Sequence, residues 1–309
     1  MNAAHADVRG MPAVRLRACD GGMATIMLHG AHVVSWVPAG APEQLYLSEQ
    51  AVYAPDQAIR GGVPVIFPQF DRVGPEPGGP RHGIARTRAW RLLQSGQDDD
   101  AVFAKFELAH DDATLVAWPR AFVLELKVTL GPRHLEMALT AGNPGSDPYA
   151  FTAALHTYLK VADIGDALVE GLAGHRFRDS ALAARLGPQA AADADAAIGV
   201  EHRRFVDFDG EVDRIYFEAG ERLRLRERGP DKDGLAADGA CVDLTMRGFE
   251  DAVVWNPGPH KAAQLNDLPR NGYRQMVCIE AARIGRPITL EPGQSWTGSQ
   301  TLHSAHVDE

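Results

Sequence analysis

The segment YAFTAALHTYLKV, residues 149–161, has the alternating apolar pattern of a β-strand with one buried face. Because successive side chains of a strand point to opposite faces, its second half divides into two sets. They are Leu155, Thr157, Leu159 and Val161 on one face, and Ala154, His156, Tyr158 and Lys160 on the other. The second set suggests a strand that lines a polar cleft, although a histidine on a solvent-facing sheet would give the same pattern.

Period-2 segments of this kind recur along the whole chain and predict an all-β fold. They lie at 24–38 (two short strands that turn near Gly30), 100–110, 122–131, 134–143, 213–220, 222–228, 240–248, 251–258, 275–284 and 295–304. Strands do not alternate with helices, which argues against a doubly wound α/β sheet. We therefore expect one large antiparallel β domain over residues 1–309, with a core at about 14–304 and flexible tails.

Helical signals are few. The segments at 180–186 and 189–197 have a helix-favouring composition, and we interpret the second, which is rich in alanine, as a solvated loop insertion. The segment DKDGLAADG, residues 231–239, opens like a calcium loop. Its sixth position is Ala236 where such a loop needs glycine, so we expect an exposed turn there.

Composition and charge narrow the possible functions. The 309 residues are 45% hydrophobic and carry a formal net charge of −10, which argues against nucleic acid or an anionic membrane as the partner. Cys19, Cys241 and Cys278 lie far apart, as expected in a reducing compartment. We find no signal peptide and no apolar run near the roughly 20 residues of a membrane helix, so we expect a cytoplasmic protein. Phosphate-loop, dinucleotide and H-E-x-x-H motifs are missing, and we expect no metal and no cofactor.

Arginines gather in one region of this acidic chain. Between positions 60 and 91 there are six, Arg60, Arg72, Arg81, Arg86, Arg88 and Arg91, and only Asp71 and Glu76 oppose them. Guanidinium groups bind phosphate and carboxylate oxygens in bidentate pairs. The cluster therefore predicts an anion site, although a solvated basic loop would give the same run.

Other side chains could carry acid–base chemistry. His82 lies inside the arginine cluster, whose charge would keep its imidazole neutral; the alternative is a structural histidine bonded to backbone. Glu280 interrupts the apolar run 276–284, where burial would raise the pKa of its carboxyl towards the range of a general base. The alternative is an edge-strand salt bridge, for example with Arg283. Asp213 gives a similar but weaker signal; Asp207 or Asp209 nearby could serve instead, or none of the three. This combination suits proton transfer on an anionic small molecule.

Seven segments together resemble the glucose-6-phosphate 1-epimerases (hexose-6-phosphate mutarotases) of the aldose 1-epimerase, or galactose mutarotase-like, superfamily. They are AIRGGVPVIFPQF, RHGIARTRAW, LHTYLKVADI, DRIY, DAVVWNPG, GYRQMVCIE and LEPGQSW, with HGAHVVSW at 29–36 in addition. The similarity runs in order from about Gly30 to about Leu302. The resemblance implies a single large antiparallel β-supersandwich, with the active site in a groove across one sheet.

The resemblance also implies roles for individual residues. The histidine of the LHTY strand, His156, is the expected general acid, and the glutamate of the CxE strand, Glu280, the expected general base. The aspartate of DRxY, Asp213, is expected to bond sugar hydroxyls. Arg60 and Arg86 correspond to phosphate-binding arginines.

Three further positions follow from the same resemblance. Arg81 occupies a position where the family places a polar side chain at the ligand, and His82 corresponds to a groove-lining histidine. Gly258 stands where many relatives carry a bulky aromatic residue, so we expect a more open groove wall there.

The expected enzyme is an isomerase that interconverts the α and β anomers of a hexose 6-phosphate, with glucose 6-phosphate as substrate and a monomer as the working form. Glu280 would take the proton of the C1 hydroxyl while protonated His156 gives one to the ring oxygen. We expect the groove to raise the pKa of both groups unless Lys160 or an arginine opposes it. The alternatives are an aldose 1-epimerase for free hexoses, a non-catalytic sugar-phosphate-binding protein, and a structural interaction protein.

Overall fold

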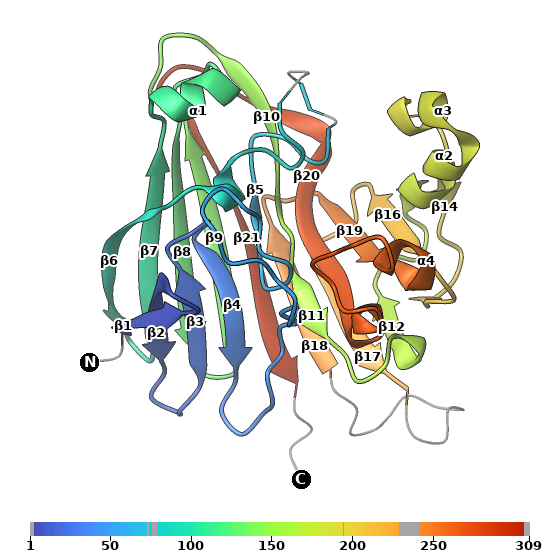
Figure 1. Cartoon of the computed structure of the whole chain (residues 1–309), viewed down its shortest axis with the longest axis horizontal. Coiled ribbons are helices and arrows are strands. Elements are labelled where there is room, and N and C mark those ends of the chain that lie inside the picture. Colours follow the sequence, from blue (N-terminus) through green and yellow to red (C-terminus); the bar gives the residue numbers. More distant parts are fainter. Residues whose placement is uncertain (1–2, 73, 76–78, 194, 229–240, 306–309) are drawn as a thin grey trace.

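The computed structural model describes residues 3–72, 74–75, 79–193, 195–228 and 241–305. Two large antiparallel sheets pack over one apolar core, and a smaller N-terminal sheet packs against the same core (Figure 1). The turn expected at 231–239 lies outside the described residues. No helix in the described ranges is long and apolar enough to cross a membrane.

The N-terminal sheet has the order β1-β2-β3-β4. Its strands are β1 (Ala3–Val8), β2 (Met11–Arg17), β3 (Met23–Met27) and β4 (His32–Val37). β3 and β4 confirm the two strands predicted at 24–38, which turn at Gly30 (φ +74°). β1 lies ahead of residue 14, so residues 3–13 hold strand structure where a flexible tail was expected.

The first large sheet, called here the β9 sheet, has the order β15-β12-β17-β18-β21-β9-β8-β7-β6. Its strands are β6 (Arg91–Asp98), β7 (Ala101–Ala109), β8 (Val123–Gly131), β9 (His134–Gly142), β12 (Ala167–Glu170), β15 (Phe205–Val206), β17 (Arg222–Glu227), β18 (Cys241–Arg247) and β21 (Ser295–Ala305). β8 and β9 alternate buried and half-buried residues along their length. A tight turn at Pro132 and Arg133 joins them, and Arg133 has a left-handed backbone (φ +58°).

The second large sheet, called here the β20 sheet, has the order β14-β13-β16-β19-β20-β10-β5, and β11 also pairs with β20. Its strands are β5 (Val65–Ile66), β10 (Tyr149–Leu155), β11 (Tyr158–Lys160), β13 (Arg176–Asp179), β14 (Ile198–Val200), β16 (Val212–Tyr216), β19 (Asp251–Asn256) and β20 (Met276–Leu290). The single strand predicted at 149–161 is therefore wrong, because His156 and Thr157 separate β10 from β11.

Helical elements lie at the ends and edges of the sheets (Figure 1). They are α1 (Asp112–Ala117), α2 (Ser180–Leu186), α3 (Pro188–Ala192), α4 (Gly258–Ala262), and the 3-10 turns η1 (Ala85–Thr87), η2 (Ile164–Asp166) and η3 (Gly272–Gln275). The sequence analysis did not predict α1 or α4. α2 confirms the helical composition at 180–186. The loop predicted at 189–197 is wrong in its first part, which forms most of α3.

Candidate functional site

The break between β10 and β11 keeps the pairing register with β20. Leu155 pairs with Ala281 before the break, and Tyr158 pairs with Cys278 after it. His156, in the break, and Glu280, on β20, therefore stand opposite each other with their side chains on the same face. Two residues that are 124 positions apart in the sequence become a cross-strand pair for this reason.

The same register fixes what surrounds this pair on the face of the sheet. One row runs through Asp213, Trp255, Cys278 and Tyr158, and the next through Ile215, Val253, Glu280 and His156. Apolar side chains thus form most of the floor, and a few polar groups stand at fixed places on it. Sugar-binding clefts need this combination, because a ring has apolar C–H faces and polar edges.

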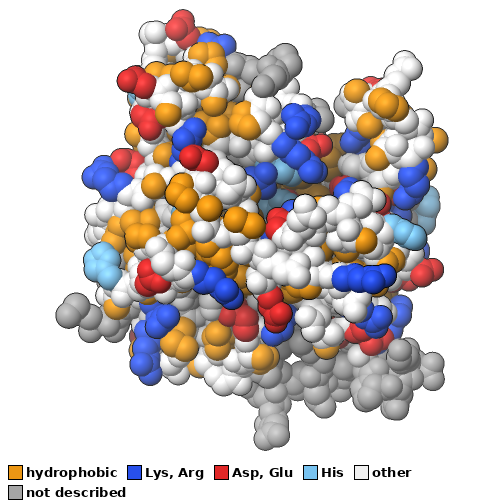
Figure 2. Space-filling view, in the orientation of Figure 1, with side chains coloured by type: hydrophobic (Ala, Val, Ile, Leu, Met, Phe, Trp, Pro, Cys, Tyr) orange, Lys and Arg blue, Asp and Glu red, His pale blue; other side chains and the backbone are white. Residues whose placement is uncertain are grey.

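This face forms the floor of a cavity of about 740 Å³. All seven site residues predicted from the sequence line it: Arg60, Arg81, His82, Arg86, His156, Asp213 and Glu280. In Figure 2 a hollow lies beside the protruding α2–α3 region, and basic and histidine side chains gather at it. The structure therefore brings together residues from five separate stretches of the chain.

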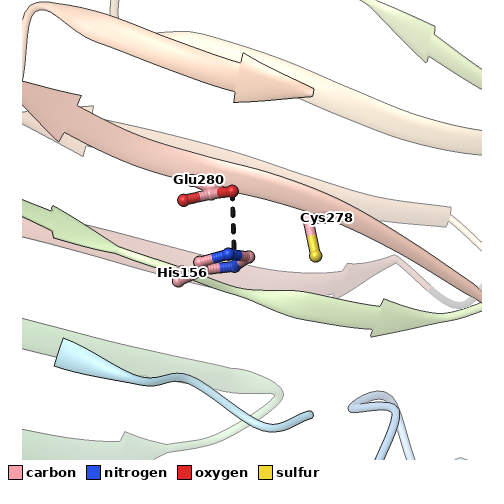
Figure 3. A group of neighbouring side chains, drawn as sticks. All are labelled: His156, Cys278 and Glu280. Carbon is pink, nitrogen blue, oxygen red and sulfur yellow. Dashed lines mark ion pairs between the residues drawn. The ribbon is translucent and has the colours of Figure 1, made fainter. Parts of the chain in front are cut away.

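His156 and Glu280 form the centre of the cavity floor. His156 Nδ1 lies 3.3 Å from Glu280 Oε1, and the two residues are 7% and 1% exposed (Figure 3). The contact lacks hydrogen-bond alignment, so His156 Nδ1 has no hydrogen-bond partner among the described residues, and Glu280 Oε2, the other carboxylate oxygen, has none there either. The His156 ring stacks on the Tyr158 ring, with centroids 4.8 Å apart.

Burial and nearby charge shift the pKa values of the two groups in opposite directions. Burial raises the pKa of the Glu280 carboxyl well above its ordinary value, and Asp213 adds to this. Burial lowers the pKa of His156 well below its ordinary value, and the Arg86 and Arg60 charges lower it further. The expectation that burial raises the pKa of Glu280 is confirmed. The expectation that the groove raises the pKa of His156 is wrong, because burial favours the neutral form, which for a base means a lower pKa.

His82 is held in one tautomer by the backbone. Its Nδ1 accepts a hydrogen bond from the Asp71 amide (3.2 Å), so the neutral ring carries its proton on Nε2. Burial lowers the pKa of His82 well below its ordinary value, and the Arg86 charge lowers it further, which confirms that it is neutral. The His82 and His156 rings meet edge to face, 5.7 Å apart. His82 also has a left-handed backbone (φ +61°), a conformation that costs energy for a non-glycine residue and is frequent at functional sites.

Three of the six clustered arginines line the cavity, and their partners differ. Arg60 donates to the Asp267 carboxylate (3.2 Å) and to the Tyr158 hydroxyl (2.9 Å). Arg81 pairs with Asp71 (2.5 Å). Arg86 has no carboxylate partner in the described part of the chain.

The Arg86 guanidinium is left under-bonded. It donates from one terminal nitrogen to the Arg81 carbonyl (3.1 Å), and its Nε is buried without a hydrogen-bond partner in the ranges described. Burial lowers its pKa to about 10, so it remains a cation at neutral pH. The other arginines of the cluster do not line the cavity: Arg88 pairs with Asp56, Arg91 pairs with Glu107, and Arg72 is exposed. The anion-site prediction therefore narrows to one side of the cavity, with Arg86 as its least compensated charge.

Asp213 stands on β16, two strands away from Glu280. Burial raises the pKa of its carboxyl to about 6, and the Lys261 ammonium, 3.7 Å away, opposes that shift. A carboxyl with this pKa is ionised at neutral pH and accepts hydrogen bonds from hydroxyls.

Gly258, on α4 beyond β19, does not line the cavity. A Cβ there would lie 2.6 Å from the Glu211 backbone nitrogen, so backbone packing explains the glycine, and the expectation of a more open wall is wrong.

A buried hydrogen-bond network lies directly behind the pair. The Thr157 hydroxyl donates to the Gln300 side-chain oxygen (2.5 Å), and the Gln300 amide donates to the Ile279 carbonyl (3.1 Å). Thr157 and Ile279 are the chain neighbours of His156 and Glu280, and the Ile279 amide donates to the Thr157 carbonyl (3.1 Å). Gln300 belongs to β21 of the other large sheet, so this network ties the strand break to the opposite layer of the fold.

The sequence analysis missed the far wall of the cavity, where α2 and α3 stand on β13. Arg178, 8% exposed, donates to the Ser180 hydroxyl (3.2 Å) and to the carbonyls of Ala191 (2.8 Å) and Asp193 (3.2 Å). It thereby fixes the carboxyl end of α3, so the alanine-rich segment contributes to the cavity. Arg178 was not recognisable, because most of its partners are backbone carbonyls that have no sequence signature. Asp267 was missed because 207 positions separate it from Arg60.

Comparisons with known proteins give a consistent result. The family described as aldose 1-epimerase matches residues 12–303. A protein of Cenchrus ciliaris with the name "Putative glucose-6-phosphate 1-epimerase" is 32% identical over 306 residues, which cover 95% of this chain and 84% of that protein. A protein of Escherichia coli K12 with the same name is 34% identical over 262 residues, covering 84% and 79%. The crystal structure of a "putative mutarotase" from Salmonella typhimurium superposes with a TM-score of 0.84 at 28% identity, covering 99% and 94%, which confirms the expected supersandwich fold.

Proposed function

Because the chain belongs to the aldose 1-epimerase family, we propose that it interconverts the α and β anomers of a hexose 6-phosphate, with glucose 6-phosphate as the substrate. The family match and the names of the relatives support the reaction. The cavity supports the phosphate, because one of its walls carries Arg60, Arg81 and Arg86 beside the His156–Glu280 pair. The reaction leaves the oxidation state of the sugar unchanged.

The reaction opens and closes the hemiacetal ring. Breaking the C1–O5 bond requires a proton to leave the C1 hydroxyl and another to reach O5. We assign the first transfer to Glu280 as general base and the second to His156 as general acid. The aldehyde then rotates about C1–C2 and the ring closes on the other face with the roles exchanged. Each positioned proton transfer contributes roughly 10²–10⁴-fold to the rate.

The phosphate has a second role in this scheme. In the free protein, burial and the arginine charges favour a neutral His156 and a protonated Glu280, which is the reverse of the required state. A phosphate dianion at Arg60 and Arg86 cancels the charges that lower the pKa of His156. The proton can then pass from Glu280 to His156 Nδ1 across their 3.3 Å contact, which leaves the imidazolium Nε2–H to serve the sugar. Substrate binding thus prepares the acid and the base together.

One observation carries the phosphate assignment: Arg86 reaches the cavity with a buried Nε and no carboxylate partner in the described residues. A dianion would supply the missing bonds. The test is NMR exchange spectroscopy on equilibrated glucose 6-phosphate, with free glucose in a parallel sample. We expect faster exchange between the α and β anomeric protons of the phosphorylated sugar. Equal acceleration of free glucose would favour an aldose 1-epimerase without a phosphate site, and no acceleration of either sugar would overturn the proposal.

A further inference from the structure

The thiol of Cys278 lies beside the His156–Glu280 pair and takes no part in the proposed reaction. The Cys278 sulfur, a ring nitrogen of His156 and a Glu280 carboxylate oxygen all lie within 4.8 Å of one another. Cys278 and Glu280 are two positions apart on β20 and so share a face, and His156 stands opposite Glu280 (Figure 3). All three residues are buried.

Two of these groups carry polar atoms that the protein does not satisfy. His156 Nδ1 and Glu280 Oε2 are buried and lack hydrogen-bond partners within the described structure. Unpaired buried polar atoms are costly, and they persist mainly where a ligand or a reaction uses them. A sulfur, an imidazole nitrogen and a carboxylate oxygen are also the three ligand types that Zn²⁺ prefers.

The spacing of the donor atoms fits a tetrahedral ion. Zn–N and Zn–O bonds of about 2.0–2.1 Å at tetrahedral angles place the two donors about 3.3 Å apart. The observed separation of His156 Nδ1 and Glu280 Oε1 is 3.3 Å. The longer Zn–S bond, about 2.3 Å, brings the Cys278 sulfur within reach after a small side-chain adjustment. His156 and Glu280 line the cavity, so an ion can reach them from there, and its fourth position would face the cavity.

We propose that His156, Cys278 and Glu280 form an inhibitory site for Zn²⁺, which competes with the sugar for the catalytic pair. Binding displaces the proton of the Cys278 thiol and that of the Glu280 carboxyl to solvent, and the resulting thiolate and carboxylate offset the two charges of the ion. Mg²⁺ does not fit, because it prefers six oxygen ligands in an octahedron. The inhibition depends on the proposed function, whereas the binding does not.

The first experiment measures binding directly, so that it does not depend on the reaction. The full chain, without an affinity tag that contains histidine, is titrated with ZnCl₂ and with MgCl₂ by calorimetry. We expect one Zn²⁺ site and no Mg²⁺ site. Cys278→Ser and Cys278→Ala should each weaken Zn²⁺ binding by at least the roughly 10–100-fold that losing a mere supporting contact costs. Cys19→Ser is the matched control and should bind as the parent does, since Cys19 is exposed and does not line the cavity.

The second experiment follows anomer exchange with and without Zn²⁺. We expect Zn²⁺ to slow anomer exchange by the parent and by Cys19→Ser, and a chelator to restore the rate of both. Zn²⁺ should have little effect on the exchange rate of the Cys278 variants. The inference is overturned if the parent binds no Zn²⁺, or if folded Cys278→Ser and Cys278→Ala bind it as tightly as the parent. If the parent binds Zn²⁺ through Cys278 but exchanges no sugar, the site stands and the proposed function fails.

Discussion

The two large sheets of this protein use their side chains differently. In the β9 sheet, β8 and β9 alternate one buried residue with one half-buried residue, and oppositely charged pairs such as Lys105–Glu125 lie across neighbouring strands. In the β20 sheet, β10, β19 and the first half of β20 are buried on nearly every residue. One face of these strands meets the core and the other forms the cavity floor. Regular alternation therefore marks the supporting layer, and its loss marks the layer that carries the site.

Substitutions in the two sheets should differ most in their effect on the rate of anomer exchange. We expect Glu280→Gln and His156→Asn each to slow anomer exchange of glucose 6-phosphate by roughly 10²–10⁴-fold, because each removes one positioned proton transfer. Exchange spectroscopy at saturating substrate measures the loss.

Glu125→Gln on β8 is the matched control and should keep the parent rate, since Glu125 pairs with Lys105 within the β9 sheet and does not line the cavity. A Glu280→Gln variant that exchanges sugar at the parent rate would contradict the assignment of the base.

The next effect concerns the substrate. Arg86→Ala removes the least compensated cation of the cavity, and charge-assisted hydrogen bonds are worth about 1.5–3 kcal/mol. We expect kcat/KM for glucose 6-phosphate to fall roughly 10–100-fold and the slow rate on free glucose to stay unchanged. Arg91→Ala, which removes an arginine paired with Glu107 outside the cavity, is the control. Equal losses on both sugars would refute a phosphate role for Arg86.

A smaller kinetic effect is expected from the network that joins the two sheets. Gln300→Leu leaves the Thr157 hydroxyl and the Ile279 carbonyl without their partner, at about 1–3 kcal/mol each, so the variant should unfold at lower urea concentration. Gln300 touches neither reacting group and acts by positioning. We therefore expect kcat to fall up to about tenfold at a temperature where the variant is folded, while KM changes little.

The control for this variant is Gln94→Leu, at an exposed position of β6, which should change neither quantity. A Gln300→Leu variant that loses stability but keeps the parent kcat would show that the network supports the fold alone.

These expectations also show what the sequence could and could not predict. The alternating strands of the β9 sheet were recognisable because period 2 records one buried and one exposed face. The break at His156 and Thr157 was not, since the residues around it keep that same period. Residue types pointed to His156, Glu280 and Arg86, but not to their partners. The neutral state of His156 depends on burial and on arginines that other segments bring to it, and only the folded chain contains that information.

The Glu280 carboxyl should also make stability depend on pH. Its pKa is raised in the folded protein, so its favourable contribution is complete below the unfolded value of about 4.5 and is lost as the pH rises towards the folded value. Each unit of the shift corresponds to about 1.4 kcal/mol. Glu280→Gln cannot ionise, so we expect it to be more stable than the parent at about pH 8 and similar to it at about pH 4. Urea unfolding at the two pH values measures this, and a variant less stable than the parent at both would contradict the shift.

The smallest effect should come from the charged pairs of the β9 sheet. Lys105 and Glu125 lie 2.8 Å apart on neighbouring strands, and both side chains are about one-third exposed. Exposed pairs of this kind contribute about 0.2–1 kcal/mol, and salt screens them. We therefore expect Lys105→Ala to lower the free energy of unfolding by less than about 1 kcal/mol, with the difference shrinking in high salt and anomer exchange unchanged. A larger loss, or any change in exchange, would mean that this sheet also determines the geometry of the site, and the contrast between the two layers would fail.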